Sequence, residues 1–135
     1  MESLIYLDTH VAAWLYAGLL ELFGQRVRAF LDGEDLLVSP MVELELQYLH
    51  EIDKIAEDGR TVVEGLSAKV GLRVCDLPFA QVVSRGLDQS WTRDPFDRLI
   101  VAQAALAGAV LLTKDCTIRR HYPRAFWDPT DPLPR

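Results

Sequence analysis

The chain has 135 residues, and we expect residues 1–135 to form a single domain with a substantial core. Half of the residues are hydrophobic and a quarter are charged, which is an ordinary globular composition. The formal net charge of −6 argues against binding nucleic acid through a broad basic surface, but not against a nuclease whose acidic side chains bind divalent cations.

The cysteines and the N-terminal residues indicate the expected cellular compartment. Cys75 and Cys116 lack the spacing of a zinc site or a disulfide framework, which favours a reducing, cytoplasmic setting. The N-terminus opens with Met1-Glu2 rather than a basic run. The apolar stretch Val11–Leu20 is about half of the ~20 residues that a membrane span needs. We therefore expect no signal peptide and no contact with a membrane.

Short apolar runs alternate with helical patterns along the chain. Leu4–Leu7 predicts a buried strand that ends at Asp8 and Thr9, which suit the start of a helix over His10–Ala17. The elements that follow are predicted as a helix over 20–31, a strand over 36–38, a helix from Pro40 to about Ile52, a helix over 62–69, a strand over 73–75 and a helix over 79–87.

The last third of the chain continues this alternation. It predicts a helix from Pro95 to a stop at Gly108, a strand over 109–113, a short helix over 117–121, an edge strand at Phe126-Trp127 and an irregular proline-rich tail. Strands that alternate with helices imply a parallel sheet covered on both faces, which is an α/β fold.

Four carboxylates are expected at one edge of this sheet. Asp8 and Asp115 follow strands, Glu45 lies one to two turns into the helix after the second strand, and Asp97 lies in the first turn of its helix. Ligands of such sheets bind beyond the carboxyl ends of the strands.

The Pro95 helix places Asp97 at the edge of the interior. Asp94 is its expected N-cap, and Asp97 falls where its carboxylate can reach back to the Asp94 N–H. The segment Leu99–Ala107, interrupted only by Gln103, has no polar face and is therefore expected to be buried. A carboxylate beside it needs a cap, a cation or a metal.

Two glutamates on the Pro40 helix differ in the direction that they face. Glu45 falls within the apolar stripe between Met41 and Leu49, whereas Glu43 falls on the opposite side and is expected to be solvated. A cap does not explain an inward carboxylate in a helix interior, although an ion pair with a buried arginine would.

Capping explains Asp8, Asp97 or Asp115 taken singly, but not the convergence of four acids. A shared cause is a Mg²⁺ or Mn²⁺ ion, which prefers oxygen ligands, neutralises phosphoryl charge and activates water to hydrolyse phosphodiesters. We expect His10 either to act near the site or to be a structural histidine. We expect Arg93, Arg98 and Lys114 either to contact substrate phosphates or to form surface ion pairs with neighbouring acids.

The acids lie within segments that together resemble a known family: Leu7–His10, Ser39–Leu46, Arg93–Ala104 and Leu112–Asp115. In this order and spacing they resemble the PIN-domain nucleases, and most of all the VapC-type toxins of bacterial toxin–antitoxin pairs. The resemblance implies an α/β/α sandwich and a Mg²⁺- or Mn²⁺-dependent endoribonuclease that cleaves RNA, is usually dimeric and is inhibited by a cognate antitoxin.

By position, the family's four acids correspond to Asp8, Glu45, Asp97 and Asp115, with Glu43 a rival for the second place. We expect these four to be the catalytic and metal-binding residues. Thr113 resembles the small hydroxyl residue that the family places near the metal. The candidate supporting or substrate-contacting residues are Thr9, His10, Asp94, Arg98, Thr113 and Lys114.

A non-enzymatic phosphoacceptor signalling domain, with Asp76 as the acceptor, is the alternative. Such a domain also uses carboxylates and Mg²⁺ on an α/β fold. It needs a pair of adjacent acids after the first strand, where this chain has only Asp8, and it leaves the inward Glu45 unexplained.

Overall fold

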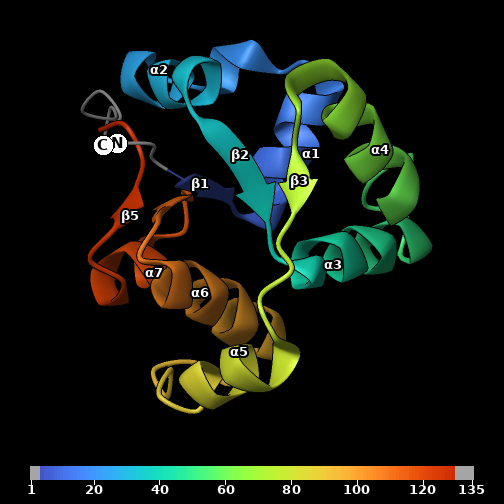
Figure 1. Cartoon of the computed structure of the whole chain (residues 1–135). Coiled ribbons are helices and arrows are strands. Elements are labelled where there is room, and N and C mark those ends of the chain that lie inside the picture. The colour runs from blue at the N-terminus through green and yellow to red at the C-terminus, as the bar shows by residue number, and fades with distance from the viewer. Residues whose placement is uncertain (1–3, 130–135) are drawn as a thin grey trace, which may run out of the picture.

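Five short parallel strands form one sheet, in the order β3-β2-β1-β4-β5, in a computed structural model that describes residues 4–129 (Figure 1). The predicted α/β class and parallel sheet are thus confirmed. The tail residues 130–135, predicted to be irregular, lie outside the described residues. The strands are β1 Leu4–Leu7, β2 Asp35–Val38, β3 Arg73–Val74, β4 Val110–Leu112 and β5 Ala125–Phe126.

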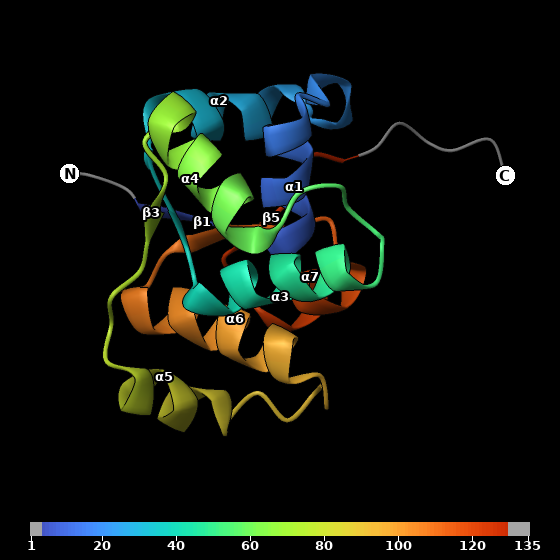
Figure 2. The same cartoon turned by 90° about the vertical axis from the view of Figure 1, so that its right-hand side faces the viewer.

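Helices cover both faces of the sheet and make the predicted three-layer sandwich. Figure 2 shows α1, α2 and α4 on one side and α5, α6 and α7 on the other, and α3 packs against both α4 and α6. The helices are α1 Thr9–Ala17, α2 Gln25–Gly33, α3 Pro40–Glu51, α4 Gly59–Val70, α5 Phe79–Gly86, α6 Pro95–Ala107 and α7 Cys116–His121, with a 3₁₀ turn, η1, at Leu20–Leu22.

The central strand lies in the middle of the core. In β1, Ile5 and Leu7 are fully buried, and Tyr6 is paired with Leu37 of β2 and Leu111 of β4. Strands covered on both faces need continuous apolar runs, which is what these short segments provide. Within residues 4–129, no helix combines the length and the apolar character needed to cross a membrane.

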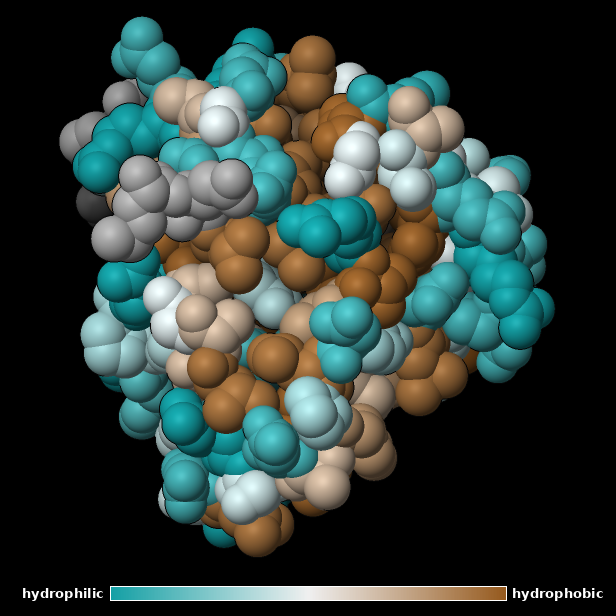
Figure 3. All heavy atoms as spheres, viewed as in Figure 1, coloured by the Kyte–Doolittle hydropathy of each residue, from teal (hydrophilic) through white to brown (hydrophobic). Residues whose placement is uncertain are grey.

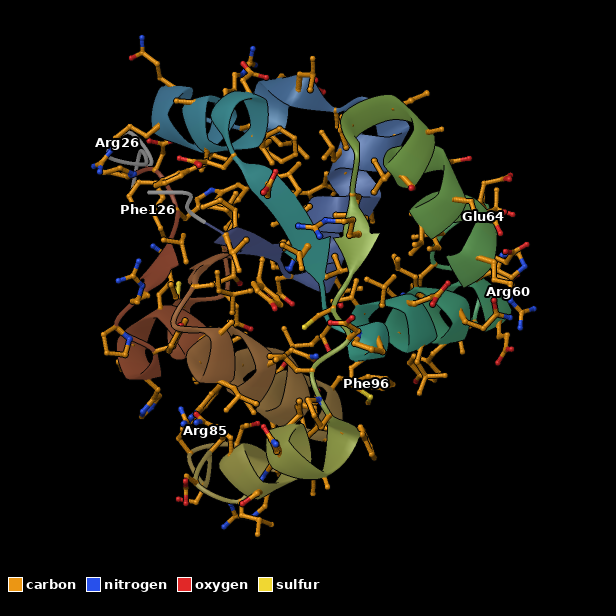
Figure 4. The ribbon with its side chains drawn as sticks, viewed as in Figure 1. Arg26, Arg60, Glu64, Arg85, Phe96 and Phe126 are labelled. Carbon is orange, nitrogen blue, oxygen red and sulfur yellow. The ribbon has the colours of Figure 1, made fainter. Side chains whose placement is uncertain are left out.

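The single helix predicted over 20–31 is wrong, because Gly24 separates η1 from α2. The carboxylate of Asp128, which follows β5, accepts hydrogen bonds from the backbone N–H groups of Arg26 and Val27, at 3.3 and 2.9 Å. Asp128 therefore caps α2 from the other end of the chain. The Arg26 guanidinium also lies 4.6 Å from the centre of the Phe126 ring, so two contacts join α2 to β5 (Figure 4).

An apolar groove remains open between α2 and α4, where Figure 3 shows hydrophobic side chains at the surface. Its volume is about 160 Å³. The apolar residues that line it are Leu15, Leu20, Phe23, Leu31, Leu36 and Val70.

Close packing of α4 on α3 fixes the helix that carries Glu45. The Gly59 N–H donates to Gln47 Oε1, and a Cβ atom at residue 59 would lie 2.5 Å from the Glu43 carbonyl oxygen. Only glycine permits this approach without a backbone shift. The predicted inward stripe of α3 ends earlier than expected, because α3 stops at Glu51 and Ile52 is exposed.

We predict that Gly59→Ala lowers the free energy of unfolding by about 1–3 kcal/mol, because the methyl group displaces the backbone of α3. Gly33→Ala is the matched control: residue 33 has open space around its Cβ position and should gain about 0.4–1 kcal/mol. Urea unfolding of both variants measures the difference. Equal stability of the two variants would show that α3 and α4 do not pack this closely.

Candidate active site

Asp8 is the most enclosed of the predicted site acids. It follows β1, is only 4% exposed, and accepts hydrogen bonds from the Thr9 N–H at 2.8 Å and from the Thr113 hydroxyl at 2.6 Å. The same Thr113 oxygen accepts from the Asp115 N–H at 3.1 Å. Thr113 therefore ties the ends of β1 and β4 together and fixes the Asp8 carboxylate between them.

Glu45 is half-buried on α3 and faces the start of α1, as its helical position predicted. The Thr9 hydroxyl donates to Glu45 Oε1 at 2.5 Å. Burial raises the pKa of the Glu45 carboxyl, the Thr9 hydrogen bond opposes the rise, and the nearby charges of Asp8 and Asp94 add to it. Glu43 lies apart from this contact, in a groove between α3 and α4.

An ion pair with arginine does not account for Glu45. In the described range 4–129, Arg73 forms an ion pair with Asp35, at 3.9 Å, and the ring of His10 lies 3.6 Å from the Asp8 carboxylate. Over the same range, no lysine or arginine therefore compensates any of the four site acids. An ion pair with a buried arginine therefore does not explain the inward Glu45 within these residues.

Asp97 has the most perturbed carboxyl group of the cluster. Its pKa is raised to about 7, mainly by burial and then by the charges of Asp94, Asp8, Asp115 and Glu45. Each of these carboxylates therefore lies near enough to disfavour ionisation of Asp97. These charges come from the ends of β1 and β4, from α3 and from the Asp94 cap, so the other three predicted acids lie within electrostatic range of Asp97.

The capping role predicted for Asp97 is wrong, whereas that of Asp94 is confirmed. The Asp94 carboxylate accepts from the N–H groups of Phe96 and Asp97, at 2.8 and 3.4 Å. The Asp94 N–H donates to the Thr92 hydroxyl rather than to the Asp97 carboxylate. Because the Thr92 hydroxyl accepts from the Asp94 N–H, the Asp97 carboxylate does not act as the cap and can bind another group.

Asp115 caps helix α7, as its position after a strand predicted. One carboxylate oxygen accepts from the N–H groups of Thr117 and Ile118, at 2.8 and 3.0 Å, at the start of α7. A cap orients the carboxylate without neutralising it. Asp115 therefore still contributes negative charge to the cluster.

His10 is a satisfied structural histidine next to the acids. Its Nε2 accepts from the Lys114 backbone N–H at 3.0 Å, its Nδ1 lies 3.6 Å from Asp8, and its ring packs against Trp14. Burial lowers its pKa, although Asp8 and Asp115 oppose that shift. A neutral imidazole that bridges α1 to the segment after β4 is consistent with all of these contacts.

The neighbouring arginines hold the backbone of the loop before α6. Arg98 donates to the Thr92 carbonyl at 2.9 Å and Arg93 to the Ser90 carbonyl at 2.8 Å. Within residues 4–129, neither arginine forms the surface ion pair that was predicted as the alternative to a phosphate contact.

A buried hydrogen bond that sequence reasoning missed joins the two helices that carry Glu45 and Asp97. The Ser39 hydroxyl, which caps α3, donates to Gln103 Oε1 of α6 at 2.6 Å. Both side chains are buried. The signal in the sequence was Gln103 itself, the one polar residue in an apolar helix.

The donor set fits a hard divalent cation. Mg²⁺ is usually held by one or two carboxylates together with water and substrate oxygens, and carboxylates that raise one another's pKa are stabilised when a cation joins them. Among residues 4–129, no three His, Cys, Asp or Glu side chains are grouped so that they could hold a metal ion together. A Mg²⁺ or Mn²⁺ ion that kept its waters would need only one or two of these carboxylates, whereas a structural zinc ion would need four protein ligands.

Comparison with known proteins places this geometry in a known group. A model of the PIN domain matches residues 5–122. The chain is 32% identical over 134 residues to Ribonuclease VapC22 of Mycobacterium tuberculosis, covering 89% of this chain and 94% of that relative.

Solved structures share the fold at lower identity. The crystal structure of VapBC2 from Rickettsia felis bound to a promoter DNA fragment matches with a TM-score of 0.62 and 20% identity, over 93% of this chain and 99% of that chain. A toxin–antitoxin complex from Klebsiella pneumoniae matches with a TM-score of 0.61 and 16% identity, over 90% and 95%. The comparisons favour the nuclease prediction over the phosphoacceptor alternative.

We predict a pH-dependent stability that Asp97→Asn removes. Without metal, the folded pKa of Asp97 lies above its ordinary value of 3.8, so the protonated carboxyl favours the folded state below that value. This advantage disappears as the pH rises towards about 7. In EDTA, thermal unfolding should show the stability of Asp97→Asn rising relative to that of the wild type as the pH increases from 3.8 to about 7. Asp32→Asn, on α2, is the control. Parallel profiles of the wild type and Asp97→Asn would contradict the burial of this carboxyl.

Proposed function

The chain belongs to the PIN-domain family, and on that premise we propose that it is a metal-dependent endoribonuclease and the toxin of a toxin–antitoxin pair. The observation that carries the proposal is the cluster of Asp8, Glu45, Asp97 and Asp115, which has no lysine or arginine partner within residues 4–129. The similarity to a ribonuclease supports the reaction.

Asp8, Glu45 and Asp97 would hold the Mg²⁺ or Mn²⁺ ion, with Asp115 binding through water or contributing to a second ion. A divalent cation bound there supplies a Lewis acid for the phosphate and a more acidic water for the attack. The proposed substrate is the phosphodiester backbone of RNA.

The chain's own residues prepare the carboxylates for this task. The hydroxyls of Thr113 and Thr9 hold the Asp8 and Glu45 carboxylates in place. The Asp97 carboxyl, whose pKa is about 7, must lose its proton to act as a ligand. The cluster is therefore fixed in position but incompletely ionised near neutral pH.

Two protein partners are proposed. A cognate antitoxin is supported by the similarity to structures of toxin–antitoxin complexes. A homodimer is supported by apolar side chains at the surface of α3 and at the start of α6, where Leu44 and Tyr48 are about half-exposed and Tyr48 stacks on Phe96 (Figure 4). A reducing cytoplasm suits the buried and exposed free thiols of Cys75 and Cys116.

We predict that Asp8→Asn and Asp97→Asn each reduce RNA cleavage in Mg²⁺ or Mn²⁺ by about a hundredfold or more, since even loss of an outer partner of a metal ligand costs about 10–100-fold. Chelation by EDTA should have the same effect on the wild type. Cleavage of total RNA by purified protein, followed by gel electrophoresis, measures the activity.

Glu43→Gln is the matched control for Glu45→Gln, because both glutamates lie on α3 and only Glu45 is bonded to Thr9. Glu43→Gln should stay within a few-fold of the wild type. Thermal unfolding checks that each variant folds. Undiminished cleavage by folded Asp8→Asn or Asp97→Asn would overturn the assignment of these acids. An inactive Glu43→Gln beside an active Glu45→Gln would move the second acid to Glu43.

A further inference from the structure

Positive charge gathers beside the acid cluster, although the chain as a whole carries a net charge of −6. Residues 85–124 hold seven of the fourteen lysines and arginines and only four of the twenty acids, among them Asp97 and Asp115 of the cluster and the helix cap Asp94. The basic residues of this segment that are exposed are Arg85, Arg93, Lys114, Arg120 and Arg124.

These residues come from different elements that the fold places side by side. Arg85 at the end of α5 and Arg124 just before β5 both lie near enough to the Tyr122 phenol to oppose the rise in its pKa that burial causes. Figure 4 shows Arg85 beside the loop that follows α5. Arg85 and Arg124 therefore both approach Tyr122, the residue that follows α7.

A stacked aromatic pair joins the same loop to the end of α7. The rings of Trp91, in the loop between α5 and α6, and His121, the last residue of α7, are nearly parallel, with centroids 5.0 Å apart and planes inclined by 4°. The indole N–H donates to Gln89 Oε1 at 2.8 Å, which fixes the plane of the ring. Trp91 packs partly against the core, whereas His121 is exposed.

Both sides of this pair are held rigidly next to the catalytic acids. The loop that carries Trp91 ends at Asp94, three residues before Asp97, and Arg98 and Arg93 donate to its carbonyl groups. Helix α7 begins at its cap Asp115 and ends at His121. A helical rise of 1.5 Å per residue puts Asp115 and His121 about 9 Å apart along α7, a distance that a short stretch of single-stranded RNA can span.

We propose that Trp91, His121, Arg120 and Arg124 form a positioning surface for single-stranded RNA, a role that rests on the proposed ribonuclease function. A base near the cleaved phosphate stacks on His121, and the two arginines contact the backbone that follows it. Aromatic stacking combined with cations along the strand is how proteins bind single-stranded nucleic acid independently of sequence. These residues position the substrate and take no part in the chemical step.

The test measures binding apart from cleavage, by fluorescence anisotropy of a labelled, unstructured RNA of about 16 nucleotides. An Asp97→Asn background keeps the RNA intact. His121→Ala should weaken binding by about five- to 150-fold, the range expected for losing one stacked base. The double variant Arg120→Ala/Arg124→Ala should reduce the slope of log K against log salt by about 0.7 for each lost contact. Arg60→Ala, on α4, is the control and should change neither quantity.

An abasic RNA separates stacking from contacts to the backbone. His121→Ala should lose its effect on the abasic strand, whereas the double arginine variant should keep its effect. Trp91→Phe, which retains an aromatic ring behind His121, should bind within a few-fold of its parent. In the active enzyme, His121→Ala should raise KM and leave kcat unchanged, which is the signature of uniform substrate binding.

The outcomes separate this proposal from the ribonuclease proposal. If the wild type cleaves RNA but His121→Ala and the double arginine variant bind and cleave as well as the wild type, the positioning surface is refuted and the basic face serves another partner, such as an acidic protein segment. If the wild type cleaves no RNA in Mg²⁺ or Mn²⁺, the ribonuclease function itself fails, whatever the binding experiment shows.

Discussion

The site depends on one electrostatic constraint: acidic side chains from four elements lie near enough for their charges to raise the pKa of Asp97, and within residues 4–129 no lysine or arginine forms an ion pair with them. Burial of an uncompensated carboxylate is costly, so such groups either bind a cation or take up a proton. Asp8 reduces the cost with hydrogen bonds from the Thr9 N–H and the Thr113 hydroxyl. No hydrogen bond to the Asp97 carboxylate is found among residues 4–129, and its pKa rises to about 7.

The rest of the fold keeps these acids from separating. The Ser39–Gln103 hydrogen bond joins α3 to α6, and the Thr9–Glu45 hydrogen bond joins α1 to α3. Repulsion among the carboxylates is therefore opposed by the neutral Ser39–Gln103 hydrogen bond and by apolar packing, which do not depend on ionisation, and by the Thr9 hydroxyl, which favours the ionised form of Glu45. If these acids hold the proposed cation, their positions would be fixed before the cation and its phosphate bind.

Local patterns in the sequence were enough for most strands, the Asp94 cap and the inward direction of Glu45, because each depends on neighbours within one or two turns. The parallel sheet followed from the alternation of strands and helices along the whole chain. Contacts between distant segments were not predictable from such patterns. Asp128 caps α2 from 102 residues away along the chain, and Trp91 meets His121 only after the loop and α7 have packed. Asp97 was misjudged as a cap for a simpler reason: the Thr92 hydroxyl, two residues before Asp94, takes the N–H that Asp97 was expected to bind.

The most direct measurement of the central claim is a calorimetric titration of Mn²⁺ into the wild-type protein near pH 7, in two buffers with different heats of ionisation. If the acids form a cation site from which metal displaces the Asp97 proton, the binding heat depends on the buffer and reports release of a fraction of a proton. Asp97→Asn should remove this dependence. Saturable binding with the same heat in both buffers, or no saturable binding at all, would contradict the claim that these carboxylates are organised to hold a divalent cation.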